Sequence, residues 1–171
     1  MKRTQAIELP EEEIAKQKEW MATFAALEDR PHTYCVVTYG CQMNAHDSEK
    51  LEGMLTQMGM TPAVNREEAD FVIFNTCCVR DNAQRRALGN VVWLKELKKT
   101  RPELMVGVCG CMMQQPGMGE QILKQYPFVD LAFGTHNLYR FAQLMLKAVQ
   151  SRRRVVEVIQ DDEGSIPEDL P

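Results

Sequence analysis

The sequence predicts an α/β domain with a doubly wound, mostly parallel sheet, and two patterns favour this fold class. From Thr33 onward, short apolar runs alternate with segments of helical periodicity, as expected when each strand is followed by a crossover helix. One of these runs, FVIF at 71–74, is apolar throughout, which is typical of a parallel strand covered on both faces. We therefore expect about five strands within residues 32–150.

The first predicted element is a helix over residues 10–28. Pro10 suits the first turn of a helix and the three following glutamates suit its positive end. Its apolar stripe contains Ile14, Met21 and Phe24 and is short. We interpret residues 1–31 as an N-terminal helical extension that packs on the edge of the domain.

The domain itself is expected to alternate strands and helices. Strands are predicted at 34–39, 60–64, 71–74, 104–109 and 129–133. Helices are predicted at 44–58, 81–99, 116–126 and 137–150. Asn44 is the expected N-cap of the first of these helices, and Gly59 is expected to end it. Right-handed crossovers then favour a flavodoxin-like (Rossmann-like) strand order, 2-1-3-4-5.

The segment 151–171 differs from the rest of the chain. It contains one β-like stretch, VVEVI, followed by an acidic end with two prolines. This composition is typical of a linker, and we interpret the segment as a linker toward a further domain.

The composition narrows the class of protein. The chain has 171 residues, of which 44% are hydrophobic and 26% charged, so it can build a core and is not a disordered tail. With 20 Lys and Arg against 24 Asp and Glu, the formal charge is −4, and the chain lacks the basic surface that binds phosphate backbones by itself. Apolar runs of membrane-spanning length and a signal peptide are absent. We expect a cytoplasmic protein with no membrane partner.

Three of the six cysteines share one position relative to the predicted strands. Cys41, Cys77 and Cys111 each lie between the end of a strand and the start of a helix. Parallel strands open their carboxyl ends on one edge, and neighbours lie ~4.8 Å apart, so three such thiols can converge. The helix N-termini that follow them favour thiolates. We therefore predict a metal site formed by these three cysteines.

The chemistry of three thiolates leaves alternatives. Sulfur ligands select iron–sulfur clusters, zinc or copper(I). A [4Fe-4S] cluster with three cysteine ligands keeps one iron open to an exogenous ligand, whereas structural zinc usually takes four ligands in CxxC pairs. A non-enzymatic three-cysteine zinc or structural-metal module is the first alternative. A flavodoxin-like thiol-redox or nucleotide-binding domain is the second, and the sequence lacks GxGxxG, P-loop and CxxC motifs.

The other cysteines are assigned differently. Cys35 and Cys109 fall within predicted strands and are expected to be small core residues. Cys78 is left out of the ligand set, because its neighbour Cys77 matches the other strand-end positions better.

Five short motifs carry a resemblance to a known family. In order over residues 33–141, TYGCQMN, DSE, NTCCVR, GCMMQ and FGTHNL resemble the N-terminal domain of the radical-SAM methylthiotransferases. TYGCQMN and GTHNL favour the branch that acts on tRNA over the relative that modifies a ribosomal protein. The resemblance implies that Cys41, Cys77 and Cys111 hold an auxiliary [4Fe-4S] cluster. It also implies transfer of a methylthio group to carbon 2 of a prenylated adenosine next to the anticodon, with threonylcarbamoyl-adenosine as the alternative substrate.

The family pattern extends beyond this sequence. The resemblance implies a radical-SAM domain, with a second [4Fe-4S] cluster on CxxxCxxC and S-adenosylmethionine as its cofactor, and a C-terminal TRAM domain that helps bind tRNA. Neither feature occurs in the 171 residues. We therefore expect a fragment that is inactive alone and forms no deoxyadenosine. The implied partners of the full-length enzyme are tRNA, a sulfur donor and a reductant protein.

Overall fold

The computed structural model describes residues 11–39, 42–76, 93–110, 117–134 and 140–157, with Gly89, Met113 and Leu138 as single positions. Within these residues, six strands form one sheet in the order β2-β1-β3-β4-β5-β6, and every neighbouring pair is parallel. The strands are β1 (Thr33–Thr38), β2 (Thr61–Pro62), β3 (Phe71–Thr76), β4 (Met105–Gly110), β5 (Leu131–Phe133) and β6 (Val155–Glu157). The α/β class and the predicted order 2-1-3-4-5 are confirmed.

The sheet has one strand more than the sequence analysis predicted. Val155–Glu157 pairs in parallel with β5, although these residues lie in the segment interpreted as a linker. The β-like stretch VVEVI was the sequence signal for this strand. A three-residue strand at the edge of a sheet is stabilised mainly by its neighbour, so its own sequence pattern is weak.

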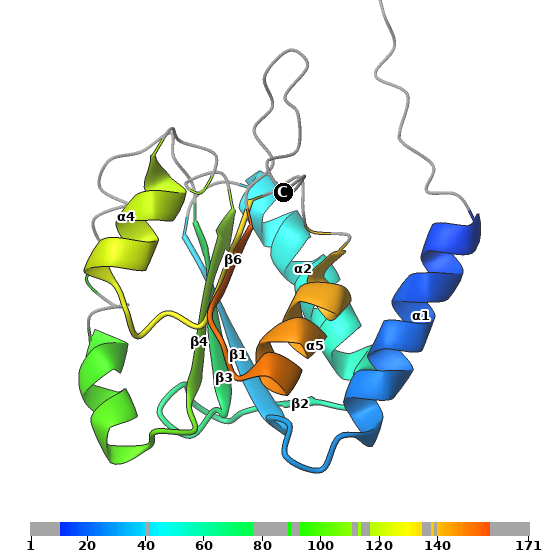
Figure 1. Ribbon diagram of the computed structural model, residues 1–171, viewed down its shortest axis with the longest axis horizontal. Coiled ribbons are helices and arrows are strands. Elements are labelled where there is room, and N and C mark those ends of the chain that lie inside the picture. Colours follow the sequence, from blue (N-terminus) through cyan, green and yellow to red (C-terminus); the bar gives the residue numbers. More distant parts are fainter. Residues whose placement is uncertain are drawn as a thin grey trace, which may run out of the picture.

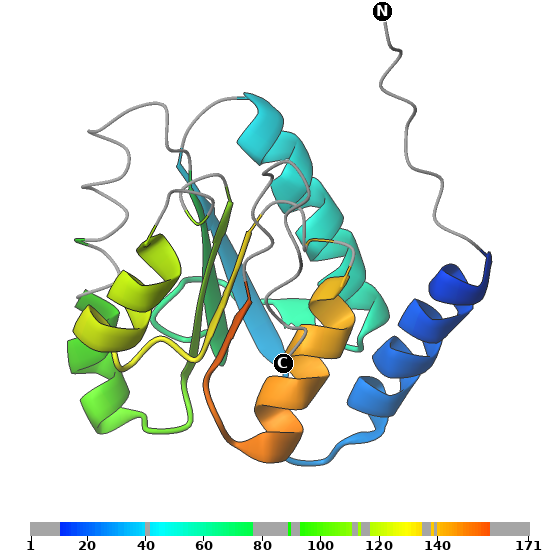
Figure 2. The ribbon, with the colours of Figure 1, turned by 45° about the horizontal axis from the view of Figure 1, so that its top comes forward.

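Helices cover both faces of the sheet. The helices are α1 (Glu11–Ala26), α2 (Gln42–Gln57), α4 (Met118–Gln125) and α5 (Phe141–Ser151), together with a helical segment at 93–100. α2 and α5 lie on one face, and α4 and the 93–100 segment lie on the other (Figure 1). α1 lies outside α5 in both views (Figures 1 and 2) and contacts it. The predicted N-terminal helix is therefore present and packed against the domain.

Each face of the sheet has its own apolar core. Along β3, Phe71 and Ile73 belong to the core under α2 and α5, whereas Val72 and Phe74 belong to the core on the opposite face. This alternation follows from the two-residue period of a strand. Because both faces are covered, all six residues of β3 are buried, as the run FVIF predicted.

The start of α2 corrects one detail of the prediction. The helix begins at Gln42, so Asn44 lies inside its first turn, and its predicted N-cap role is wrong. The helical periodicity located the buried stripe correctly, with Leu51, Leu55 and Met58 fully buried, but periodicity does not fix the first turn. Gly59 follows the helix with a φ of +87°, in agreement with its predicted role as the C-terminal stop.

None of the helices in the described ranges is both long and apolar enough to cross a membrane.

Candidate functional site

The carboxyl ends of β1, β3 and β4 lie side by side at one edge of the sheet, which we call the carboxyl edge. In the strand registers, Thr38 is paired with Asn75, Asn75 with Cys109, and Thr76 with Gly110. The backbone N–H of Tyr39 donates to the carbonyl of Asn75 at 2.8 Å, which extends the pairing one residue beyond β1. The three strands that precede the predicted ligands therefore end as direct neighbours.

The predicted ligands themselves lie outside the residues that the structure describes. This holds for Cys41, Cys77 and Cys111, and also for Cys78. The described chain reaches Tyr39, Thr76 and Gly110. Cys77 and Cys111 directly follow Thr76 and Gly110, and Cys41 is two residues beyond Tyr39. In the described part of the chain, no group of three His, Cys, Asp or Glu side chains is placed to hold a metal ion.

A buried polar network lies beneath the carboxyl edge. The Ser48 hydroxyl, on α2, is 2.6 Å from the Thr38 hydroxyl and accepts a hydrogen bond from the Asn75 side-chain amide at 3.0 Å. The Thr76 hydroxyl donates to the carbonyl oxygen of Cys109 at 2.9 Å. Ser48, Asn75 and Thr76 are all buried, so these bonds replace the hydrogen bonds that water would otherwise make.

Sequence reasoning missed Ser48 and Asn75. A signal for Ser48 is present, because this serine lies on the same helical stripe as the buried Leu51 and Leu55. A signal for Asn75 is its place directly after the apolar run FVIF, where a polar side chain enters a buried strand and needs partners.

The end of β4 makes an unusually close backbone approach to β3. Gly110 has a φ of +104°, a conformation that favours glycine. A Cβ at this position would lie 2.2 Å from the carbonyl oxygen of Thr76 and 2.6 Å from the side-chain oxygen of Asn75. Glycine is therefore required where the chain leaves β4 toward Cys111.

The described ends of these three strands carry neither carboxylate nor cationic side chains. They consist of Thr38, Tyr39, Asn75, Thr76 and Gly110. A cluster held by thiolates carries negative charge, and a surrounding of hydroxyl and amide groups does not repel it. The neutral edge and the sulfur donors in the adjoining sequence fit an iron–sulfur cluster.

Cys35 and Cys109 lie inside β1 and β4, as the sequence analysis expected. Cys109 is 2% exposed and belongs to the core under α2 and α5. Burial raises the pKa of the Cys35 thiol, and nearby Arg66 partly opposes this shift. A raised pKa disfavours the thiolate form that binds metals.

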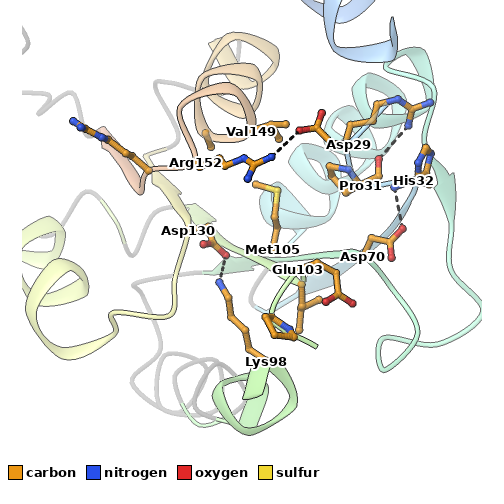
Figure 3. A pocket seen from close by; sticks show the side chains of 15 residues that line it. Asp29, Pro31, His32, Asp70, Lys98, Glu103, Met105, Asp130, Val149 and Arg152 are labelled. Carbon is orange, nitrogen blue, oxygen red and sulfur yellow. Dashed lines mark hydrogen bonds and ion pairs between the residues drawn. The ribbon is translucent and has the colours of Figure 1, made fainter. Parts of the chain in front are cut away.

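A cavity of about 570 Å³ lies at the opposite edge, where the strands begin (Figure 3). Asp70, at this amino edge, accepts hydrogen bonds from the backbone N–H groups of His32 at 2.9 Å and Thr33 at 3.2 Å. The Arg101 guanidinium pairs with the same carboxylate at 3.2 Å. Asp70 therefore joins the starts of β1 and β3.

A second carboxylate of this cavity has a similar role. Asp130 accepts a hydrogen bond from the backbone N–H of Val106 at 2.9 Å and forms an ion pair with Lys98. Figure 3 shows this pair and, across the cavity, the weaker and exposed pair of Asp29 with Arg152. Because Asp70 and Asp130 are bonded to strand starts, we assign them to the stability of the sheet and locate the candidate site at the carboxyl edge.

These features define a class: an open, parallel α/β domain with a candidate sulfur-ligated metal centre at the carboxyl edge of its sheet. Residues 33–134 match the family model described as Uncharacterized protein family UPF0004. The chain belongs to this family.

Similar proteins agree with the motif resemblance. The chain is 50% identical over 138 residues to the tRNA-2-methylthio-N(6)-dimethylallyladenosine synthase of Clostridium perfringens strain SM101, which covers 81% of this chain and 31% of that protein. It is 48% identical over 166 residues to the synthase of the same name from Acetivibrio thermocellus, covering 93% of this chain and 34% of that protein. The chain thus spans about a third of the length of these relatives. The resemblance to the N-terminal domain of the methylthiotransferases is confirmed.

Proposed function

We propose that this chain is the N-terminal domain of a tRNA methylthiotransferase and that it holds an auxiliary [4Fe-4S] cluster on Cys41, Cys77 and Cys111. The observation that carries the proposal is the juxtaposition of three neighbouring strand ends, each followed within three residues by one of these cysteines. The neutral, hydroxyl- and amide-lined edge supports a thiolate-bound cluster rather than a carboxylate-bound cation.

The cluster defines what this domain contributes. When bound by three cysteines, a [4Fe-4S] cluster supplies one iron with an open coordination position for a sulfur-containing group. The protein's own part is to hold three thiolates at one edge. The described carboxylates Asp70 and Asp130 lie at the amino edge, at the other end of the strands that precede these cysteines.

The proposed substrate rests on the name of the relatives. That name specifies dimethylallyladenosine in tRNA, so we propose a prenylated adenosine next to the anticodon rather than threonylcarbamoyl-adenosine. The relatives are about three times as long as the matched region. To the part outside that region we assign S-adenosylmethionine, a second [4Fe-4S] cluster and most of the tRNA contacts. A sulfur donor and a reductant protein complete the proposed partners, and the proposed place of action is the cytoplasm.

The first test is metal content. The chain is reconstituted anaerobically with iron and sulfide, desalted, and analysed for iron, acid-labile sulfide and zinc. We expect about four irons and four sulfides per chain. One zinc per chain without sulfide would overturn the cluster assignment and support the three-cysteine zinc module.

The second test assigns the ligands. Cys41→Ala, Cys77→Ala and Cys111→Ala are each expected to abolish cluster assembly, because each removes one of three thiolates. Cys35→Ala and Cys109→Ala serve as matched controls and are expected to retain the cluster, since both residues lie within strands. Cys78→Ala is also expected to retain it. Loss of the cluster in Cys78→Ala, as in the three ligand variants, would contradict the assignment.

A further inference from the structure

Ser48 connects three chain segments that border the predicted cluster. It lies on α2, the helix that begins directly after Cys41. Its hydroxyl contacts the Thr38 hydroxyl at the end of β1 at 2.6 Å, and it accepts a hydrogen bond from Asn75 on β3 at 3.0 Å. Only 4% of Ser48 is exposed, so water does not readily replace its hydrogen bonds. One buried hydroxyl therefore ties the segments on both sides of Cys41 to the strand that precedes Cys77.

Asn75 continues this connection to the third segment. Its amide nitrogen donates to Ser48, and its amide oxygen would lie 2.6 Å from a Cβ on Gly110. The side chain thus occupies the space between the end of β1 and the end of β4. Asn75 is 1% exposed, and a buried amide holds its orientation because rotating it would break bonds that cannot be replaced by water.

The network has the form of an outer shell around a metal site. Groups that orient ligands from behind lower the cost of bringing the ligands together. In this chain, the groups that would be oriented are the backbone segments that precede or follow the three predicted cysteines. The helical stripe of α2 that carries the fully buried Leu51 and Leu55 also carries Ser48, which contacts the ends of both strands.

We propose that Ser48 and Asn75 are positioning residues for the cluster, because they fix the relative placement of the chain segments that carry Cys41, Cys77 and Cys111. This inference rests on the proposed function. The two residues contribute no ligand atom. Their hydrogen bonds join α2 to the ends of β1 and β3, and the Asn75 side chain lies against the end of β4 at Gly110.

The test uses the complete 171-residue chain, reconstituted anaerobically. Ser48→Ala removes the hydroxyl that contacts Thr38 and accepts the hydrogen bond from the Asn75 amide. We expect iron loss to a ferrous chelator to become about tenfold faster than in the unsubstituted chain. We also expect an altered electron paramagnetic resonance spectrum of the reduced cluster and a shifted midpoint potential, because the cluster geometry is less constrained.

Thr56→Val is the matched control. Thr56 lies on the same helix, and its hydroxyl is 3.2 Å from that of Tyr34 on β1, two helical turns from Ser48 and away from the carboxyl edge. The variant removes a helix-to-strand hydroxyl contact without touching the network. We expect unchanged iron loss and an unchanged spectrum, even where urea unfolding of the apoprotein shows equal destabilisation by Thr56→Val and Ser48→Ala.

Further variants keep the test decisive. Asn75→Ala is expected to accelerate iron loss. The double variant Ser48→Ala/Asn75→Ala is expected to lose iron no faster than the faster of the two single variants, because the two residues share one bond.

If Ser48→Ala does not fold, Thr38→Val replaces it, since Thr38 is exposed and tolerates substitution. Iron loss in Ser48→Ala equal to that in Thr56→Val would overturn the positioning role alone. An unsubstituted chain that takes up no iron and sulfide would overturn the proposed function as well.

Discussion

Gly110 ends β4 with a φ of +104°, and a Cβ there would lie 2.2 Å from the Thr76 carbonyl oxygen. Gly110→Ala adds backbone strain and a contact that neither strand can relieve without moving. We expect the free energy of unfolding to fall by at least about 2 kcal/mol, measured by urea denaturation of the apoprotein. Gly117→Ala is the control, because Gly117 has a φ of +77° but no atom within 4 Å of its Cβ position. Equal losses in the two variants would show that the close approach itself costs nothing.

Gln17 is a residue whose burial works against stability. It lies on α1 and is 7% exposed, and both side-chain polar atoms are buried with no hydrogen-bond partner in the described part of the chain. Gln17→Met keeps the length of the side chain and removes the unpaired amide. We expect the free energy of unfolding to rise by about 1–2 kcal/mol. Gln57→Met, at an exposed position of α2, is expected to change it little. An unchanged or lower stability of Gln17→Met would contradict this reasoning.

At the scale of the elements, Arg154 joins α4 to the last strand. Its guanidinium donates to the carbonyl oxygens of Ile122, Leu123, Tyr126 and Val129 at 2.7–3.0 Å. Carbonyls at the end of a helix lack partners within the helix, and a planar guanidinium can bond several of them at once. Burial lowers the pKa of Arg154, and Asp130 opposes the shift.

Replacement of this arginine tests the connection between α4 and β6. Arg154→Met is expected to lower the free energy of unfolding by about 1.5–3 kcal/mol, because charge-assisted hydrogen bonds to four carbonyls are lost. Arg154→Lys is expected to recover only part of this, since an ammonium group cannot match the guanidinium geometry. Urea denaturation gives the values. Arg153→Met is the control, because Arg153 is exposed, and an equal loss there would contradict the assignment.

The elements also show what sequence patterns can determine. Periodicity and apolar runs located β1, β3, β4 and β5 because each carries a strong apolar signal, and β3, β4 and β5 are almost entirely buried. β6 was not assigned to the sheet, because its three residues depend on pairing with β5. The first turn of α2 was misplaced by two residues, since helical periodicity does not fix the residue at which a helix begins.

For the whole molecule, the sequence predicted the strand order and therefore which strand ends are neighbours. The order β2-β1-β3-β4-β5 is one of the common doubly wound orders that right-handed crossovers allow. The network of Ser48 and Asn75 could not be predicted, because it depends on the rotation of α2 against two strands. The ligand role of Cys41, Cys77 and Cys111 stays a prediction.

The molecule divides its polar groups between the two edges of the sheet. At the amino edge, Asp70 and Asp130 bind backbone N–H groups and pair with cationic side chains. At the carboxyl edge of β1, β3 and β4, the polar groups are neutral hydroxyls and amides. Charged pairs thus stabilise the strand starts at the amino edge, and a further pair, Arg140 with Glu157 at 2.8 Å, lies at the end of β6. The described ends of β1, β3 and β4 carry neutral polar groups.

The outermost strand, β2, consists of Thr61–Pro62. The N–H groups of Thr61 and Ala63 donate to carbonyls of the β1 segment, so the position between them faces outward. Proline fills that position and offers no hydrogen to an incoming strand. A strand of a second molecule would therefore find no hydrogen-bond donor at this position. The edge formed by β2 thus resists the strand-to-strand aggregation to which exposed sheet edges are prone.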